Sequence, residues 1–232
     1  MMQTCSSPLA KTLHCAISII IASAFCCATG LAQQSYYPTE AGSSWFFDSG
    51  ERIILETITE TTFNTFIADD SITPDQVRVR LRRTGDVISS REVLSFTEDG
   101  VFAHGSSAAA LQILYDPPLL IYPSAPLDVG QQWQSVTDIQ ALTFDGQAVD
   151  QPLTRVTITS TVLGIQGVET AAGRFNSLLI EQVTQLDVVG ADGEAEPVET
   201  VRLEYFVPGL GVVAFVEDGR EVVLEDTNFY IP

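Results

Sequence analysis

The sequence predicts an all-β, mostly antiparallel fold, with a sheet curved into a half-barrel or barrel-like form; a β-sandwich is the alternative. Gly and Pro clusters interrupt the chain beyond residue 32 every ten to fifteen residues. The segments between them are rich in Val, Ile, Thr, Phe and Tyr, which is typical of strands. Helical signals are nearly absent, and only Ser106–Leu111 predicts as much as one helical turn.

Strand-like segments follow one another along the chain, and we expect consecutive strands to be antiparallel neighbours. Several are separated by Asp-Gly turns, which accept the positive φ of tight hairpins. These turns are Glu98-Asp99-Gly100, Phe144-Asp145-Gly146, Ala191-Asp192-Gly193 and Asp218-Gly219. The predicted strands are Trp45–Ser49, Arg52–Phe63, Gln76–Thr84, Val87–Phe96, Val101–His104, Gln131–Ile139, Leu153–Ile165, Phe175–Val189, Val198–Val207, Val212–Glu217 and Glu221–Glu225.

A proline-rich stretch lies near the middle of the chain. Asp116–Pro126 holds four prolines, so we predict an extended connector between two halves of one domain. On either side of this seam the same spacing occurs: Pro38-x-x-x-Gly42-x-x-Trp45 and Pro126-x-x-x-Gly130-x-x-Trp133 contain the only two tryptophans. The match suggests two structurally equivalent strand starts, and seven spacings do not establish a duplication.

The first 32 residues have the pattern of a cleavable secretory signal. Lys11 and His14 precede the apolar run Ala16–Phe25, and Gly30-Leu31-Ala32 forms a small-x-small cleavage site. Cleavage between Ala32 and Gln33 leaves residues 33–232 as a single antiparallel β domain. The run is shorter than the about 20 residues of a membrane span, so we expect no transmembrane segment in the mature chain.

All four cysteines, Cys5, Cys15, Cys26 and Cys27, fall inside the predicted signal. The mature domain therefore has no disulfides. Because Phe25 precedes Cys26, and Cys26 precedes Cys27, the small residue expected before a lipidated cysteine is missing, and we expect no lipid anchor. The protein is predicted to be exported, to the periplasm or beyond the cell.

The mature chain is strongly acidic. Removing the signal leaves ten arginines against 30 acidic residues, a net charge of −20. Nucleic acid and anionic membrane surfaces repel such a chain, so neither is an expected partner.

One arginine-rich strand is the candidate ligand site. In Val77–Arg83 the apolar residues alternate with Arg78, Arg80 and Arg82, which would line one face and bind an anionic group. The alternative is pairing with acidic neighbours such as Glu56 and Glu60 on a solvated face. Trp45 and Trp133 complete the predicted ligand-binding set.

No catalytic residue, metal site or cofactor is predicted. His104 is the only histidine after cleavage, no Gly-x-Ser-x-Gly motif accompanies it, and a surface or hairpin-end position is expected. One histidine without cysteine does not build a common zinc site. Acidic clusters are abundant, and none has the spacing of a calcium loop.

Four stretches resemble a broad group of uncharacterised exported bacterial β-sheet proteins. They are Tyr36–Trp45, Pro126–Trp133, Thr170–Phe175 and Tyr205–Val213. The resemblance implies a curved antiparallel sheet akin to the periplasmic lipoprotein-carrier half-barrels, with a concave apolar face and without a catalytic residue to transfer.

These observations favour an exported, non-enzymatic binding module that holds an apolar small molecule or a protein partner segment on its concave face. Two alternatives stay open. A tight acidic pair in a deep cleft would favour a secreted carboxylate-dependent hydrolase, and a filled interior would favour a structural envelope protein.

Overall fold

Twelve antiparallel strands form a closed barrel in a computed structural model that describes residues 37–50, 53–60, 72–108, 111–124, 126–143, 147–149, 154–189 and 195–229. The strands are β1 (Ser44–Asp48), β2 (Ile53–Glu60), β3 (Val77–Thr84), β4 (Val87–Thr97), β5 (Gly100–Ala108), β6 (Leu111–Pro123), β7 (Gln132–Leu142), β8 (Thr154–Thr170), β9 (Gly173–Val189), β10 (Ala195–Val207), β11 (Gly211–Glu217) and β12 (Arg220–Thr227). A short 3₁₀ helix, Pro74–Gln76, precedes β3.

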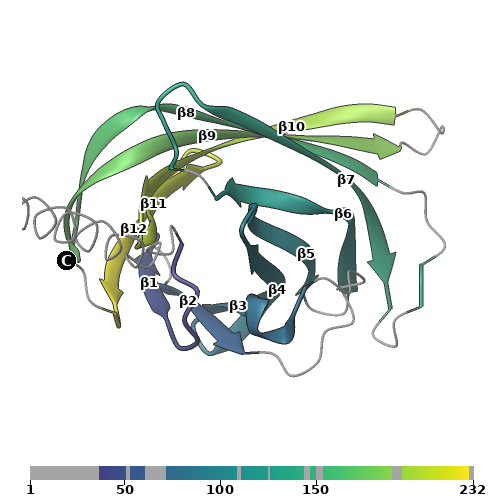
Figure 1. The fold of residues 1–232 in the computed structure, drawn as a ribbon, viewed down its shortest axis with the longest axis horizontal. Coiled ribbons are helices and arrows are strands. Elements are labelled where there is room, and N and C mark those ends of the chain that lie inside the picture. Colours follow the sequence, from purple (N-terminus) through teal and green to yellow (C-terminus); the bar gives the residue numbers. More distant parts are fainter. Residues whose placement is uncertain are drawn as a thin grey trace, which may run out of the picture. The chain divides into compact units, whose positions relative to one another are not determined.

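Each strand pairs with its neighbours in the chain, and β1 pairs with β12 to close the barrel (Figure 1). The predicted all-β, antiparallel, barrel-like fold is confirmed, and the sandwich alternative is not the fold that forms. Closure pairs the first and last strands, which would be open edges in a half-barrel. The longest strands, β8 and β9, cross the upper part of Figure 1 beside β10.

The predicted connector Asp116–Pro126 is wrong in part, because its residues as far as Pro123 belong to β6. Proline is tolerated here because β6 is irregular: Leu119 lies opposite Ala103 of β5, but Leu114 lies opposite Gly105, so several β6 residues between them have no direct partner in β5. Pairing with β7 ends at Asp116, so the following residues need no ladder bonds on that side.

The helical turn predicted at Ser106–Leu111 is also wrong. Ser106 and Ser107 continue β5 opposite β6, and Leu111 begins β6. Pairing with a neighbouring strand therefore outweighs the weak local helical preference of this stretch.

Two of the four predicted Asp-Gly hairpins are confirmed, at Glu98–Gly100 between β4 and β5 and at Asp218-Gly219 between β11 and β12. Asp218 and Gly219 have φ of 51° and 72°, the left-handed values that this turn chemistry supplies. The turns at Phe144–Gly146 and Ala191–Gly193 lie outside the described residues.

The first Pro-Gly-Trp segment leads into β1 through a tight turn. Gly42 has φ of 93°, and its N–H donates to the carbonyl of Ile58 at 2.7 Å. The N–H of Ile58 donates back to the carbonyl of Ser43 at 2.9 Å. This pair of bonds ties the turn to β2 and places Trp45 inside the barrel.

The second segment leads into β7 with the same backbone arrangement. Gly130 has φ of 88°, and its N–H donates to the carbonyl of Val162 at 2.8 Å. The N–H of Val162 donates back to the carbonyl of Gln131 at 2.9 Å. The two strand starts predicted from the repeated spacing are therefore structurally equivalent.

The main hydrophobic core joins inward-facing side chains from both ends of the chain. Tyr37 stacks with Phe96 and Tyr122, at centroid distances of 6.1 and 5.7 Å. The fully buried members include Trp45, Phe47, Ile58, Ile180, Phe206, Val213 and Leu224. A second, smaller cluster consists of Leu94, Ala103 and Leu119.

Residues 1–36 lie outside the described residues, so the signal peptide and its cleavage between Ala32 and Gln33 stay predictions. The same holds for the division into a signal and a single β domain. Within the described ranges, no helix combines the length and apolar character needed to cross a membrane.

Candidate functional site

The arginine row of β3 faces the interior of the barrel. Arg82 lies opposite Glu56 of β2, and Arg80 lies opposite Glu92 of β4. Nε and Nη2 of Arg82 donate to Glu56 Oε1 at 2.9 and 2.6 Å. Arg80 donates through Nε to Glu92 Oε2 at 3.0 Å and contacts the same oxygen through Nη2. The alternative of pairing with Glu56 is confirmed, but the pairing takes place inside the barrel and not on a solvated face.

Arg78 has different partners from the other two predicted arginines. Its Nε donates to the carbonyl of Thr39 at 3.1 Å, and its Nη1 donates to the carbonyl of Asp75 at 2.8 Å. Glu60, the other acidic neighbour considered, lies opposite Arg78, and its side chain is outside the description. Arg78 thus joins the segment before β1 to the segment before β3.

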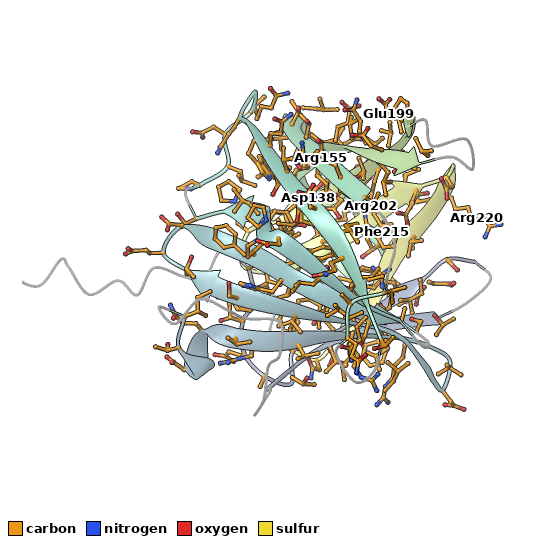
Figure 2. The ribbon with its side chains drawn as sticks, turned by 90° about the vertical axis from the view of Figure 1, so that its right-hand side faces the viewer. Asp138, Arg155, Glu199, Arg202, Phe215 and Arg220 are labelled. Carbon is orange, nitrogen blue, oxygen red and sulfur yellow. The ribbon has the colours of Figure 1, made fainter. Side chains whose placement is uncertain are left out.

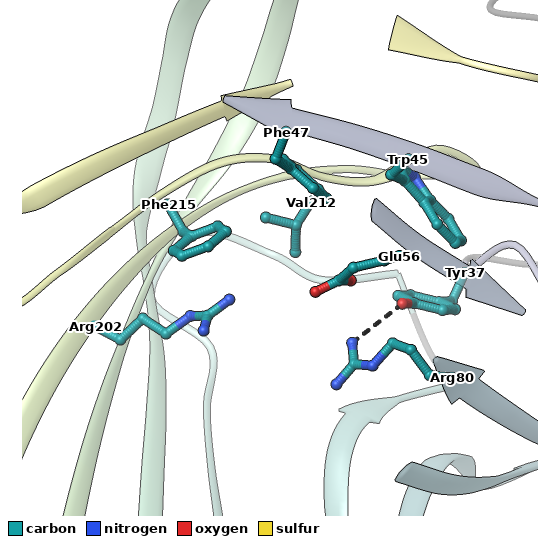
Figure 3. Close-up of a pocket in the computed structure, with 8 residues that line it drawn as sticks. All are labelled: Tyr37, Trp45, Phe47, Glu56, Arg80, Arg202, Val212 and Phe215. Atoms are coloured by element: carbon teal, nitrogen blue, oxygen red, sulfur yellow. Dashed lines mark hydrogen bonds between the residues drawn. The ribbon is translucent and has the colours of Figure 1, made fainter. Parts of the chain in front are cut away.

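A second charged group, around Arg202, faces Arg80 of β3 across the interior (Figure 3), and Figure 2 labels Arg202 next to Phe215. Arg202 Nε lies 2.9 Å from Glu204 Oε1 and forms a charge pair without a directed hydrogen bond among the described residues. The Arg202 guanidinium carbon lies 4.1 Å from the Phe215 ring centroid, a cation–π contact. Tyr122 donates its hydroxyl to Glu204 Oε2 at 2.7 Å.

Burial and charge together set the protonation of this layer. Burial alone would raise the pKa of Glu56, but the nearby Arg80 and Arg82 outweigh it and hold the pKa below its ordinary value. Burial, reinforced by the negative charge of Glu204, raises the pKa of Tyr122 well above its ordinary value. At neutral pH Glu56 is therefore an anion and Tyr122 a hydrogen-bond donor.

The space enclosed by these side chains is small (Figure 3). Its volume is about 10 Å³, which is room for about one water molecule. The lining residues are Tyr37, Trp45, Phe47, Glu56, Arg80, Arg202, Val212 and Phe215. At this level the interior holds paired charges and aromatic rings, without space for an organic ligand.

The two predicted tryptophans are core residues. Trp45 is 2% exposed and donates its indole N–H to the carbonyl of Leu210 at 2.7 Å. Trp133 is 9% exposed and donates its indole N–H to the carbonyl of Ile121 at 3.2 Å. This carbonyl lies in the part of β6 that does not pair with β7, so the indole supplies a donor in place of a strand neighbour. The structure brings Trp45 and Arg80 to the same small space, whereas Trp133 does not line it.

Arg82 and Phe215 of the ion-pair layer also line a hollow of about 600 Å³, which we call the mouth hollow. Arg82 and Arg220 contribute positive charge, and Glu217 and Asp218 contribute negative charge. The full lining is Ser49, Ile54, Arg82, Thr84, Phe215, Glu217, Asp218, Arg220 and Val222.

A larger hollow of about 900 Å³, the outer hollow, lies over the opposite face of β4, β5 and β6. Leu94 and Ala103 pack inward as a cluster, so the adjacent Ser95 and Phe102, which face each other across β4 and β5, point outward. The lining is Ile72, Gln76, Ser95, Thr97, Glu98, Asp99, Phe102, His104, Leu114, Tyr115, Asp116, Pro117 and Pro118.

A buried polar pair forms the floor of the outer hollow. His104 Nε2 lies 2.8 Å from Ser95 Oγ, and the two residues are 3% and 0% exposed. The surface or hairpin-end position expected for His104 is therefore wrong. The register between β4 and β5 shifts at Val93 and Leu94, and this shift inserts His104 as an extra residue beside Ser95.

This pair does not have the geometry of an accessible nucleophile. Ser95 lies in the middle of a paired strand and exposes none of its surface, so a substrate carbonyl has no path to its hydroxyl. Among the described residues, no group of three or more His, Cys, Asp or Glu side chains is arranged to hold a metal ion.

No protein-family model matches the chain, and no curated protein matches it. Two solved structures are similar to it. One is a candidate exported protein with a YmcC-like fold from Bacteroides fragilis, with 12% identity over 84% of this chain and 99% of the other, at a TM-score of 0.48. The other is a candidate lipoprotein from Parabacteroides distasonis, with 10% identity over 84% and 98%, at a TM-score of 0.44. Similarity at this level assigns neither a site nor a function.

Proposed function

We propose that this chain is an exported, non-enzymatic binding module that holds an apolar small molecule in the outer hollow. The observation that carries the proposal is the hollow itself, about 900 Å³ in volume, with walls that combine apolar side chains with polar and acidic ones. Small-molecule sites in proteins have volumes of about 300–1,000 Å³ and combine apolar walls with a few polar groups.

One part of the wall offers the apolar surface that such a site needs. Apolar surface comes from Ile72, Phe102, Leu114, Pro117 and Pro118. Phe102 stands on a strand paired on both sides, and the two prolines restrict the backbone of β6. A rigid wall lowers the entropy cost of binding, because little of the protein must become ordered around the ligand.

The proposal moves the expected ligand from the concave interior to the outer face of the barrel. The interior between β3 and β10 is occupied by ion pairs, and its enclosed space is about 10 Å³. Placing an apolar molecule there would require opening buried charge pairs, which costs several kcal/mol, roughly 3–5 for each pair broken. The outer hollow has no such obstacle.

A filling substitution tests the proposal. We expect the uncharged fluorescent probe N-phenyl-1-naphthylamine to bind with a blue-shifted emission and to be displaced by decanol. Thr97→Trp places a bulky ring in the hollow and should reduce probe affinity by about tenfold or more. Thr161→Trp, on the outer surface of β8, is the matched control and should leave the affinity unchanged.

Unfolding temperatures of both variants show whether the fold is intact. Equal probe binding by the original chain and the Thr97→Trp variant would contradict a site in the outer hollow.

A further inference from the structure

We infer that two copies of this chain pair edge to edge through residues 163–168 of β8 and form a reversible two-fold dimer. β8 continues to Thr170, but β7 pairs with it only as far as Thr161. Val162 is the last residue of β8 whose backbone bonds the segment before β7. Beyond it, β9 is the only strand that pairs with β8 among the described residues. Residues 163–168, which we call the β8 edge, are therefore an open strand edge.

Apolar side chains of the β8 edge are open to solvent. Leu163 is 48% exposed. Ile165 is 69% exposed, the highest value for a large apolar side chain among the described residues. A Cβ added at Gly164 or Gly167 would meet no heavy atom within 4 Å, so the space beside both glycines is empty. The β8 edge thus offers apolar contacts and leaves room for an approaching strand.

The other end of β9 borders a second open edge, which is protected. β10 pairs with β9 from Ala195 onward, but β11 pairs with β10 only from Arg202 onward. This β10 edge contains Pro197, which has no N–H to donate, and the exposed side chain of Glu199. Proteins use proline and charged side chains to keep edge strands from pairing, and residues 163–168 contain neither. The chain therefore blocks the β10 edge and leaves the β8 edge free to pair.

The charges around the β8 edge favour a second copy of the chain as its partner. No charged residue lies between Arg155 and Glu169 in the sequence. Glu169 itself pairs with Arg174 at 2.9 Å, so the charge at the end of the edge is compensated. The edge has no charge with which to select an acidic or a basic partner. Two copies can meet there without bringing like charges into contact.

The sequence of the β8 edge is also complementary to itself. Two identical edges pair antiparallel about a two-fold axis, so that the same surface of each copy takes part. With the axis at Ile165, the two Ile165 side chains become cross-strand neighbours, and Leu163 lies opposite Gly167 of the other copy. The empty space at Gly167 accommodates the leucine. Apolar cross-strand pairs of this kind stabilise a sheet.

We expect the dimer to be weak and to depend on salt. Pairing over residues 163–168 buries less surface than a standard interface of about 1,600 Å², so the dissociation constant should be weaker than about 1 µM. The mature chain carries a net charge of −20, so two copies repel each other at long range. Salt shortens the range of this repulsion from about 10 Å at 0.1 M to about 3 Å at 1 M, and association should tighten by about threefold or more.

Analytical ultracentrifugation of the exported form of the chain, from micromolar to millimolar concentration, tests the inference. We expect a monomer–dimer equilibrium in the original chain. Ile165→Lys places two like charges side by side at the axis and should weaken the dimer by about tenfold or more. Val198→Lys is the matched control, because Val198 is 47% exposed on the β10 edge and the substitution adds the same charge. This control should leave the dimer unchanged.

Amide hydrogen exchange of the original chain, in dilute and in concentrated solution, shows whether the backbone of the β8 edge takes part. Exchange within residues 163–168 should slow as the dimer forms, whereas exchange within residues 195–201 should stay the same. Unfolding temperatures of both lysine variants show whether the fold is intact.

A monomer at every concentration and salt would overturn the inference. Equal weakening of the dimer by Ile165→Lys and Val198→Lys would overturn it as well, since added charge alone would then explain the effect. So would a dimer in which the amides of residues 163–168 exchange as fast as in the monomer.

Discussion

The mouth hollow and the outer hollow are bordered by the same tripeptide and differ in charge. Glu98-Asp99-Gly100 lines the outer hollow, and Glu217-Asp218-Gly219 lies at the mouth hollow. The described lining beside the second turn also includes Arg82 and Arg220, whereas the described lining beside the first includes His104 but neither arginine nor lysine. An acidic turn therefore takes its electrostatic character from the strands that the barrel places around it.

The register of the sheet explains this difference. Arg80 and Arg82 occupy inward positions of β3, so the arginines of this strand compensate carboxylates inside the barrel. The outward positions of β4 and β5 over the outer hollow carry Ser95, Thr97 and Phe102. The carboxylates inside the barrel are thus paired with arginines. Among the described residues, the carboxylates of the outer hollow are not.

Removing one partner of an ion pair inside the barrel should cause the largest loss of stability. Glu204→Ala removes the nearer partner of Arg202 and the acceptor of the Tyr122 hydroxyl. It should lower the free energy of unfolding by about 3 kcal/mol, since it leaves a half-buried arginine with only the exposed Glu217 at 3.8 Å. Glu217→Ala removes an exposed carboxylate 3.8 Å from the same arginine and should cost less than about 1 kcal/mol. Urea unfolding monitored by tryptophan fluorescence measures both. Similar losses in the two variants would show that burial does not separate the interior from the mouth.

Removing the hydroxyl of Tyr122 should cause a smaller but measurable loss of stability. Tyr122→Phe removes a 2.7 Å hydrogen bond to the buried Glu204 and should cost about 1.5–3 kcal/mol, the range for a bond to a charged group. Tyr115→Phe removes a 3.4 Å contact with the neutral hydroxyl of Ser106 and should cost about 0.5–1 kcal/mol. The same urea experiment compares them, and a reversed order would be inconsistent with a charged interior layer.

The acid limb of the stability profile should depend on Glu56. Its pKa in the folded chain lies below the ordinary 4.5, so the unfolded chain binds more protons in acid. The stabilisation is complete above about pH 4.5 and is lost as pH falls through the folded pKa. Glu56→Gln should flatten this limb, whereas Glu169→Gln, at an exposed pair, should leave it unchanged. Unfolding free energies between pH 2 and 7 give the slope, and an unchanged slope in Glu56→Gln would contradict the assignment.

At alkaline pH the stability of the fold should instead decrease as pH rises, because of Tyr122. Its folded pKa lies well above the ordinary 10.0, so the folded chain retains a proton that the unfolded chain loses. The stabilisation is present below pH 10 and falls as pH rises toward the folded pKa. Tyr122→Phe should reduce the loss of stability above pH 10, and phenolate absorbance at alkaline pH reports whether this tyrosine ionises only on unfolding. Early ionisation of all tyrosines would argue against its burial with Glu204.

Neutralising the carboxylates of the two acidic turns should cause the smallest changes in stability, and the two changes should have opposite signs. Glu98→Gln with Asp99→Asn relieves like-charge repulsion and should raise the unfolding free energy by up to about 0.5 kcal/mol. Glu217→Gln with Asp218→Asn removes an attraction to nearby arginines and should lower it by less than about 1 kcal/mol. High salt should bring both differences toward zero. Changes of the same sign would remove the electrostatic distinction between the hollows.

The sequence predicted the fold well because the governing signals are local. Alternation placed Arg78, Arg80 and Arg82 on one face, and Asp-Gly turns predicted the hairpins at Asp99 and Asp218. It did not predict that the arginine face lies inside the barrel, because closure depends on the pairing of β1 with β12, from opposite ends of the chain.

The outer hollow was harder to predict. It depends on an extra residue in β5 at His104 and on an irregular β6, and neither has a strong local signature. The prolines of β6 indicate a connector by local rules, although they occupy a strand that has no ladder bonds to β7 beyond Asp116. A partial signal was present in the run Asp116-Pro117-Pro118, which combines a carboxylate with rigid apolar residues.

Native mass spectrometry of the exported form of the chain, purified from its own cells, tests the central claim most directly. We predict a stoichiometric bound molecule of apolar character, which is retained by the Thr161→Trp control and absent from the Thr97→Trp variant. An unliganded protein, or a bound molecule retained equally by both variants, would contradict a ligand site in the outer hollow.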